Sequence, residues 1–190
     1  MLFRGNTMND QQKKILLDVA RDTVIAVVND RSYSPPGTDD PELNKNCGCF
    51  VTLKTFERLR GCIGQFTSDK PLVKLVSVMA RSSASSDPRF LADRLKPDEL
   101  NDLDIEISVL SPLELTDDPL SLKLGIDGIY ITKGPRSGCF LPQVATETGW
   151  TKEQFLSYCC SHKAGLPEDA WKETDTQVYL FTAEVFGETD

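Results

Sequence analysis

Apolar positions recur at helical spacing in two stretches of the first half of the chain. One stretch runs from Asp10 to Asn29 and the other from Pro71 to about Ser83. Residues three or four positions apart lie on one side of a helix, so each stretch predicts an amphipathic helix packed on a sheet. Asn9 or Asp10 is a suitable cap for the first helix, and Thr67-Ser68-Asp69 for the second.

A period of two predicts the strands. Apolar and polar positions alternate, or β-forming residues gather, in six runs, which are residues 49–54, 58–63, 104–113, 126–133, 136–141 and 178–186. Two pairs of runs predict hairpins, one turning at Thr55-Phe56-Glu57 without glycine and one around Gly134-Pro135. The last run is apolar on both faces, which predicts a strand in the centre of a sheet.

The order of these elements predicts the fold class. Strands come as hairpins with helices between them, and shorter helices are predicted at 97–103, 142–149 and 151–165. A regular β-α-β alternation is missing from this order, so the sequence predicts an α+β fold with a mainly antiparallel sheet, packed helices and a smaller second lobe. At 190 residues the chain suits one domain over 10–186, with 1–9 as an N-terminal extension.

Charge and hydropathy narrow the classes of partner. The formal net charge is −8 and the basic residues form no long run, which argues against nucleic acid or an anionic membrane as partner. The first eight residues lack the apolar core of a signal peptide, and no stretch reaches the length of a membrane span. We therefore expect a cytoplasmic protein. A homodimer is compatible with the apolar strand edges.

The six cysteines predict thiols rather than disulfides or a metal site. The chain has enough apolar residues for a core without cross-links. Cys47, Cys49 and Cys62 lack a second pair of ligands at a suitable spacing, and the adjacent Cys159 and Cys160 point about 100° apart on a helix. No metal site is predicted, and no cofactor is identified.

The most distinctive chemistry lies in the segment from Arg58 to Phe66, Arg-Leu-Arg-Gly-Cys-Ile-Gly-Gln-Phe. Strand alternation places Arg60 and Cys62 on one face, roughly 6.6 Å apart along the strand. A fixed guanidinium beside a thiol favours a reactive or ligand-touching cysteine, and Gly61 and Gly64 leave the backbone uncrowded. The alternative is that Cys62 is simply a small buried hydrophobic residue.

A general base for this thiol is not evident. The single histidine, His162, is predicted at a helix end, where a solvated imidazole near the C-terminal dipole is the ordinary explanation. Glu106 and Glu184 on strands are further carboxylates, with solvated side chains as the alternative. Asp87 is expected to close an Asx turn.

Four motifs in order resemble one family. They are the Arg58–Phe66 segment, Asp87-Pro88-Arg89-Phe90, Asp104-Ile105-Glu106-Ile107-Ser108-Val109-Leu110-Ser111, and Ser137-Gly138 followed by Leu141-Pro142-Gln143-Val144. Their order and spacing, from about Gln11 to Phe186, resemble the AMMECR-one domain family. This resemblance implies the same α+β architecture with a smaller lobe and no established reaction.

Two hypotheses follow from the motifs and the resemblance. In the first, the protein has a catalytic or small-ligand pocket in which Cys62 touches the substrate, Arg60 holds its anionic group, and Gly61, Gly64 and Gln143 complete the site. In the second, it is a non-enzymatic adaptor. The resemblance implies partners of the Memo-like or radical SAM type, because relatives occur fused to or beside such proteins.

Overall fold

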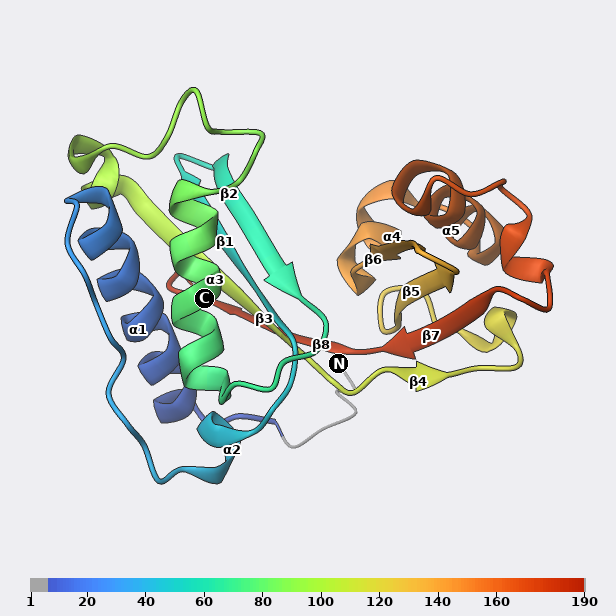
Figure 1. Cartoon of the computed structure of the whole chain (residues 1–190), viewed down its shortest axis with the longest axis horizontal. Helices are drawn as coiled ribbons and strands as arrows, with labels where there is room; N and C mark the ends of the chain where they lie inside the picture. Colours follow the sequence, from blue (N-terminus) through green and yellow to red (C-terminus); the bar gives the residue numbers. More distant parts are fainter. Residues whose placement is uncertain (1–6, 190) are drawn as a thin grey trace. The chain divides into compact units, whose positions relative to one another are not determined.

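A four-stranded sheet with helices on one face forms the first of two units in this computed structural model, which describes residues 7–189 (Figure 1). The first unit comprises residues 7–110 and 184–189, and the second comprises 111–183. The strand order is β2 (Arg58–Gln65), β1 (Cys49–Thr55), β3 (Leu103–Leu110), β8 (Ala183–Gly187), with β1 antiparallel to both neighbours. The predicted α+β class with mainly antiparallel sheets is confirmed.

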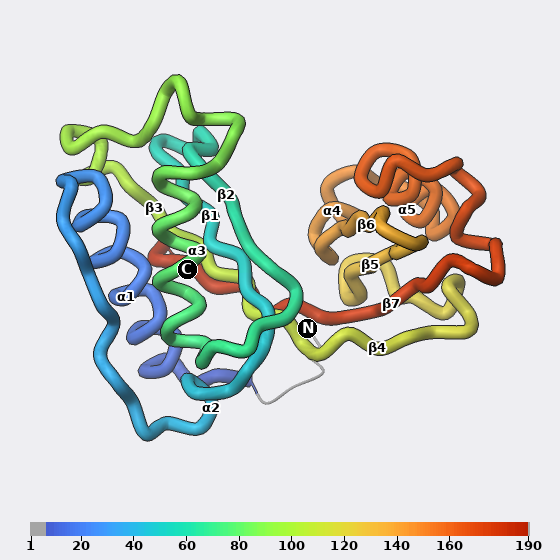
Figure 2. The backbone as a smooth tube through the Cα atoms, viewed as in Figure 1, coloured from blue at the N-terminus to red at the C-terminus, as the bar shows by residue number. Residues whose placement is uncertain are grey.

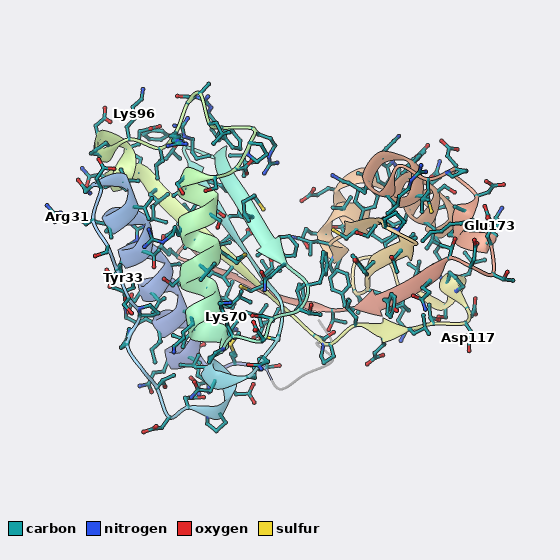
Figure 3. All side chains as sticks on the ribbon, in the orientation of Figure 1. Arg31, Tyr33, Lys70, Lys96, Asp117 and Glu173 are labelled. Carbon is teal, nitrogen blue, oxygen red and sulfur yellow. The ribbon has the colours of Figure 1, made fainter. Side chains whose placement is uncertain are left out.

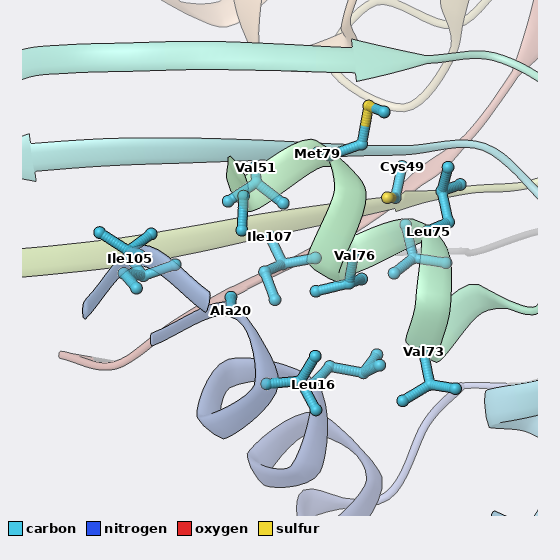
Figure 4. Packing of buried hydrophobic residues seen from close by; sticks show 14 of the residues in the cluster. Leu16, Ala20, Cys49, Val51, Val73, Leu75, Val76, Met79, Ile105 and Ile107 are labelled. Carbon is cyan, nitrogen blue, oxygen red and sulfur yellow. The ribbon is translucent and has the colours of Figure 1, made fainter. Parts of the chain in front are cut away.

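Two long helices cover one face of this sheet. They are α1 (Asp10–Val28) and α3 (Leu72–Ser85). The loop 29–40 and the short α2 (Pro41–Asn44) lead from α1 to β1, whereas α3 follows β2. Residues alternate between buried and half-buried along β1, as expected when only one face is covered. Figure 4 shows the resulting core, in which Leu16 and Ala20 of α1 and Val76 of α3 lie against Val51 and Ile107 of the strands.

The second unit has its own sheet and core. Its strand order is β4 (Glu114–Leu115), β7 (Gln177–Phe181), β5 (Gly128–Lys133), β6 (Arg136–Phe140). Apolar residues of β5 and β7 pack with Phe155 and Leu156 in a separate cluster. Its helical segments are η2 (Pro119–Ser121), α4 (Pro142–Thr148), α5 (Lys152–Tyr158), the π-helical η3 (Cys159–Ala164) and η4 (Ala170–Lys172).

The single central strand predicted over 178–186 is wrong. The segment forms two strands, β7 in the second sheet and β8 at the edge of the first. The strand predicted over 104–113 ends early, as β3 at Leu110, and β4 of the second sheet begins only after it, at Glu114; the tube in Figure 2 follows the chain from one strand to the other. Ser111 and Thr182 stand at the two breaks, where Ser111 N–H donates to the Thr182 carbonyl and Thr182 N–H donates to the Ser111 hydroxyl, each at 2.9 Å.

Helix starts agree with the sequence in one case and differ in the other. Asn9 caps α1 with a reciprocal bond to Gln12, as predicted. The cap predicted at Thr67-Ser68-Asp69 is wrong, because the Ser68 hydroxyl accepts the Lys70 N–H in a local turn and α3 begins only at Leu72, after Pro71, without a side-chain cap.

The N-terminal extension and the helix predicted over 97–103 also have counterparts in the structure. Met8 is 2% exposed and its N–H donates to the Glu184 carboxylate, so Met8 is packed into the first unit, whereas 1–6 lie outside the described residues. The helix predicted over 97–103 is the 3₁₀-helix η1 (Pro97–Asp102).

Glycine at position 61 permits a close approach of α3 to the sheet. A Cβ at Gly61 would lie 2.1 Å from the Ser83 carbonyl oxygen. The Ser83 hydroxyl also enters the ladder between β1 and β2, accepting the Ile63 N–H at 2.9 Å and donating to the Val51 carbonyl at 2.7 Å. The contact is backbone to backbone, so no side-chain rotation can relieve a larger residue.

We expect Gly61→Ala to lower the free energy of unfolding by about 2 to 3 kcal/mol, because α3 must move away from the sheet. Denaturant unfolding followed by circular dichroism measures this loss. Gly37→Ala is the matched control, since a Cβ there meets no atom within 4 Å. A loss for Gly61→Ala no larger than that of the control would contradict the account of the packing.

Candidate functional site

A bulge interrupts β2 at Arg60. Leu53 of β1 stands opposite Gly61, but the next residue, Lys54, stands opposite Leu59, so Arg60 has no partner across the ladder. The extra residue breaks the strict alternation, which corrects the prediction that Arg60 and Cys62 are two steps apart on one face of a regular strand. A bulge depends on the pairing register, so a period of two cannot reveal it.

The guanidinium of Arg60 is buried and bound by protein groups. It is 2% exposed and forms ion pairs with Asp93 at 3.1 Å and Glu99 at 3.0 Å. It also donates to the backbone carbonyls of Asp93 and Arg94, at 3.3 and 3.2 Å. These contacts fix the segment 93–99 against β2, which is a structural use of the charge.

Cys62 lies on the face of the sheet that the helices leave free. It pairs with Thr52, which stands between the buried Val51 and Leu53 of β1 and points to the opposite side. The Thr52 hydroxyl donates to the Cys62 sulfur at 3.2 Å, and the residue is only half-buried. Cys62 is therefore not the sealed hydrophobic residue of the alternative interpretation.

The outer edge of β2 is closed at Cys62 by two side chains instead of a further strand. The Asp87 carboxylate accepts the Cys62 N–H at 2.9 Å, and the Arg89 guanidinium donates to the Cys62 carbonyl at 3.2 Å. A carboxylate and a guanidinium thus replace the acceptor and donor of a neighbouring backbone. This satisfies the polar groups of an edge that could otherwise pair with another chain.

Asp87 is the centre of this arrangement. Its side chain is 1% exposed and accepts two bonds from the Arg89 side chain, at 3.0 and 2.6 Å, and one from the Arg89 N–H at 3.1 Å. The hydrogen bonds from Arg89, together with the bond from the Cys62 N–H, lower the pKa of the Asp87 carboxyl from 3.8 to about 2. The expected Asx turn is present, and the same carboxylate also accepts the Cys62 N–H at the edge of β2.

Arg89 is the arginine that faces Cys62. Its side chain is 54% exposed, and bonding to Asp87 raises its pKa, with a smaller contribution from Cys62. Sequence reasoning gave this position to Arg60 and missed Arg89. The available signal was the motif Asp-Pro-Arg-Phe at 87–90, where a carboxylate two residues before an arginine can hold it bidentately.

Gly64 serves the same free face of the sheet. A Cβ at this position would lie 2.3 Å from the ring of Phe50, which stands opposite Gly64 on β1 and packs edge-on against Phe66. Gly61 and Gly64 therefore admit α3 on one face and an aromatic ring on the other. In both positions the structure shows a packing reason for glycine.

The other predicted residues lie away from Cys62 in the chain and have different surroundings. Gln143 lies on α4 in the second unit, and within the described residues its side-chain oxygen is buried without a hydrogen-bond partner. His162 stacks on Tyr158 in the same unit, with ring centroids 5.1 Å apart. Glu106 pairs with Lys54, and Glu184 with Lys13 and the Met8 N–H.

Two other candidate chemistries, metal binding and reactivity of the remaining thiols, find no support in the described residues. Residues 7–189 contain no cluster of three or more His, Cys, Asp or Glu side chains placed to hold a metal ion. Burial raises the pKa of the thiols of Cys47, Cys49, Cys159 and Cys160, which keeps them protonated at neutral pH.

The surface of the protein has hollows away from Cys62. Three surface hollows of about 460 to 500 Å³ are lined by residues other than Cys62, along α1 and β8, at the ends of α1 and α3, and around Trp171. In the part of the chain that the structure describes, no helix has the length and apolarity needed to cross a bilayer.

Asp87→Asn should lower the free energy of unfolding by about 1 to 2 kcal/mol at pH 7. This is less than the pKa shift alone gives, because solvent screens the exposed guanidinium of Arg89. The folded-state pKa is depressed to about 2, so this contribution is present above the unfolded value near 4 and is lost as the pH falls through 2. Urea unfolding from pH 6 to pH 2 should show wild type and variant converging. A constant gap, or one equal to that of the exposed control Asp69→Asn, would count against the network.

Comparisons with known proteins agree with these motifs and this fold. Residues 17–186 match the AMMECR1 family. The chain is 43% identical to a protein of Thermococcus onnurineus, over 95% of this chain and 92% of the relative, and 41% identical to Protein PH0010 of Pyrococcus horikoshii, over 99% and 94%. The crystal structure of that uncharacterized PH0010 protein superimposes with a TM-score of 0.85 at 41% identity, covering 95% of this chain and 93% of the other. The chain belongs to the AMMECR1 family.

Proposed function

We propose that this protein binds a small anionic ligand at the free face of its first sheet, in the cytoplasm, with Arg89 holding the anionic end and Cys62 touching the ligand. The observation that carries the proposal is the placement of a half-buried thiol beside a guanidinium that is fixed by Asp87 yet 54% exposed. The guanidinium retains donor capacity toward solvent, since a bidentate carboxylate occupies only part of its five N–H groups.

The proposal transfers the anion-holding role from Arg60 to Arg89. The two terminal nitrogens of Arg60 donate to Asp93, Glu99 and two carbonyls, and the side chain is 2% exposed, so Arg60 supports the site through the segment 93–99. Gly61 and Gly64 shape the backbone on either side of Cys62. All these residues belong to the first unit, whereas Gln143 belongs to the second unit and has no role in the proposed site.

Ligand contact is the form of function that the geometry supports best. A nucleophilic thiol needs a general base within hydrogen-bond reach, and the Cys62 side chain interacts with the Thr52 hydroxyl and the Arg89 guanidinium. Neither group accepts a proton at neutral pH. The proposal therefore ends at binding, and a catalytic role would require the base to come with the ligand.

Iodoacetate and iodoacetamide test the recruitment of an anion to Cys62, because they differ chiefly in charge. We expect Arg89→Gln to lower the ratio of iodoacetate to iodoacetamide rates at Cys62 by about fivefold, corresponding to an exposed charge interaction of about 1 kcal/mol. Peptide mass spectrometry follows Cys62 separately from Cys47 and Cys139.

The controls separate charge at the site from charge in general. Arg58→Gln removes an exposed arginine of the same strand that pairs with Asp93, and it should leave the ratio unchanged. Arg89→Lys should restore most of the ratio. If Arg89→Gln and Arg58→Gln gave the same ratio as wild type, Arg89 would have no anion-holding role.

One observation favours the alternative function, a partner-binding module. Phe56 lies at the tip of the β1–β2 hairpin, is 81% exposed, and has a positive φ of 50°, as does Glu57 with 60°. A two-residue turn of this kind suits Asn-Gly, and a bulky aromatic residue is strained there. Exposure and strain together are explained if the ring inserts into a partner, such as a Memo-like or radical SAM protein.

The double variant Phe56→Asn, Glu57→Gly should raise the free energy of unfolding by about 1 kcal/mol, because both residues accept positive φ. Under the partner-binding alternative, the same change should abolish co-purification with a co-expressed Memo-like protein. Binding that survives the change, measured by size-exclusion chromatography of the purified pair, would remove Phe56 from the interface.

A further inference from the structure

A second positively charged place lies at the C-terminal ends of α1 and α3. A hollow of about 460 Å³ is lined there by Arg31, which follows α1, by Arg81 on α3, and by Arg94, with Val27 and Leu95 among the apolar lining residues. In Figure 3 the side chain of Arg31 projects from the chain at the end of α1. The residues at this hollow are different from those around Cys62.

The side chains of these three arginines have no polar partner within the part of the chain that the structure describes. Within residues 7–189, the side chains of Arg31, Arg81 and Arg94 make no ion pair or hydrogen bond, whereas the other arginines there are all engaged, namely Arg21, Arg58, Arg60, Arg89 and Arg136. Three uncommitted guanidinium groups around one hollow are unusual in a chain of net charge −8. They can turn their donors to a ligand without breaking an existing bond.

Charge compensation by the fold accounts for only part of this cluster. Each helix C-terminus carries about half a negative charge, and Asp30 adds one more at the rim. Against three guanidinium charges, these groups leave a surplus of about one positive charge. The arginines therefore do more than neutralise the two helix ends and Asp30, and the surplus favours an anion.

The backbone under each arginine is held in place. The Arg94 carbonyl accepts from the buried Arg60, the Arg81 carbonyl accepts from the Ser85 hydroxyl, and the Arg31 N–H donates to the Ala26 carbonyl. The hollow is also within the size range of small-molecule sites. Fixed starting points reduce the entropy lost when the side chains close on a ligand.

We propose that this hollow binds the phosphate group of a small phosphorylated metabolite, with Arg31, Arg81 and Arg94 donating to the phosphate oxygens. Guanidinium groups match phosphate geometry bidentately, and the surplus positive charge of the hollow attracts an anion. The apolar lining at Val27 and Leu95 can cover the rest of a small ligand. This site is independent of the function proposed for Cys62.

Isothermal titration of the full chain with ribose 5-phosphate, inorganic phosphate, citrate and ribose tests the proposal. We expect saturable binding of ribose 5-phosphate, weaker binding of phosphate, and none of ribose. Arg81→Gln and Arg94→Gln should each weaken ribose 5-phosphate about tenfold, the effect of losing one charge-assisted contact. Lys74→Gln, which removes an exposed cation of α3 outside the hollow, should change affinity less than twofold.

Other outcomes overturn the proposal. Binding that Lys74→Gln weakens as much as Arg81→Gln would be attraction to net charge alone. Binding that is lost in Arg89→Gln but kept in Arg81→Gln and Arg94→Gln would belong to the Cys62 site. Citrate binding as tightly as ribose 5-phosphate would show an unselective anion site, and no saturation by any phosphate would show no site.

Discussion

The carboxylate of Asp87 is the group on which the candidate site depends. It is almost fully buried, and it receives the Cys62 N–H, the Arg89 N–H and the Arg89 guanidinium. A buried charge is tolerated only when its lone pairs are satisfied, and here the donors come from a strand edge and from the turn that follows α3. One side chain therefore fixes the free edge of β2, the direction of Arg89 and the position of Cys62.

Most residues of the segment around Cys62 have a packing role, and Cys62 itself is the exception. Gly61 admits the backbone of α3, Ile63 faces the core, and Gly64 leaves space for the Phe50 ring. Arg60 fills the bulge and anchors the segment 93–99. Only Cys62 presents a chemically distinctive side chain on the face that the helices leave free.

Sequence periodicity predicted the elements whose pattern is local. The amphipathic spacing in α1 and α3 and the alternation in β1 depend on neighbours within a few residues, and both helices and the hairpin were found close to their observed bounds. The α+β class followed from their order. The division of 178–186 into β7 and β8 could not be found, because both halves are apolar and the break at Thr182 depends on hydrogen bonds with Ser111, far away in the chain.

The sequence predicted only the part of the site that depends on neighbouring residues. Cys62 was identified from its segment alone, but its arginine partner comes from a turn 27 positions further on. The bulge at Arg60 depends on the register with β1, so regular alternation gave the wrong guanidinium. The three arginines of the second hollow come from the loop after α1, from α3 and from the loop after α3, and only the fold shows that they line the same space.

An acid titration of the Cys62 backbone amide by NMR tests the central claim most directly. Because this N–H donates to the Asp87 carboxylate, its chemical shift reports the protonation of that group. The account predicts a transition with a midpoint near pH 2, the pKa set by Arg89 and by the Cys62 N–H itself. A midpoint near pH 4, or no transition before the protein unfolds, would show that Asp87 does not hold Arg89 and Cys62 together.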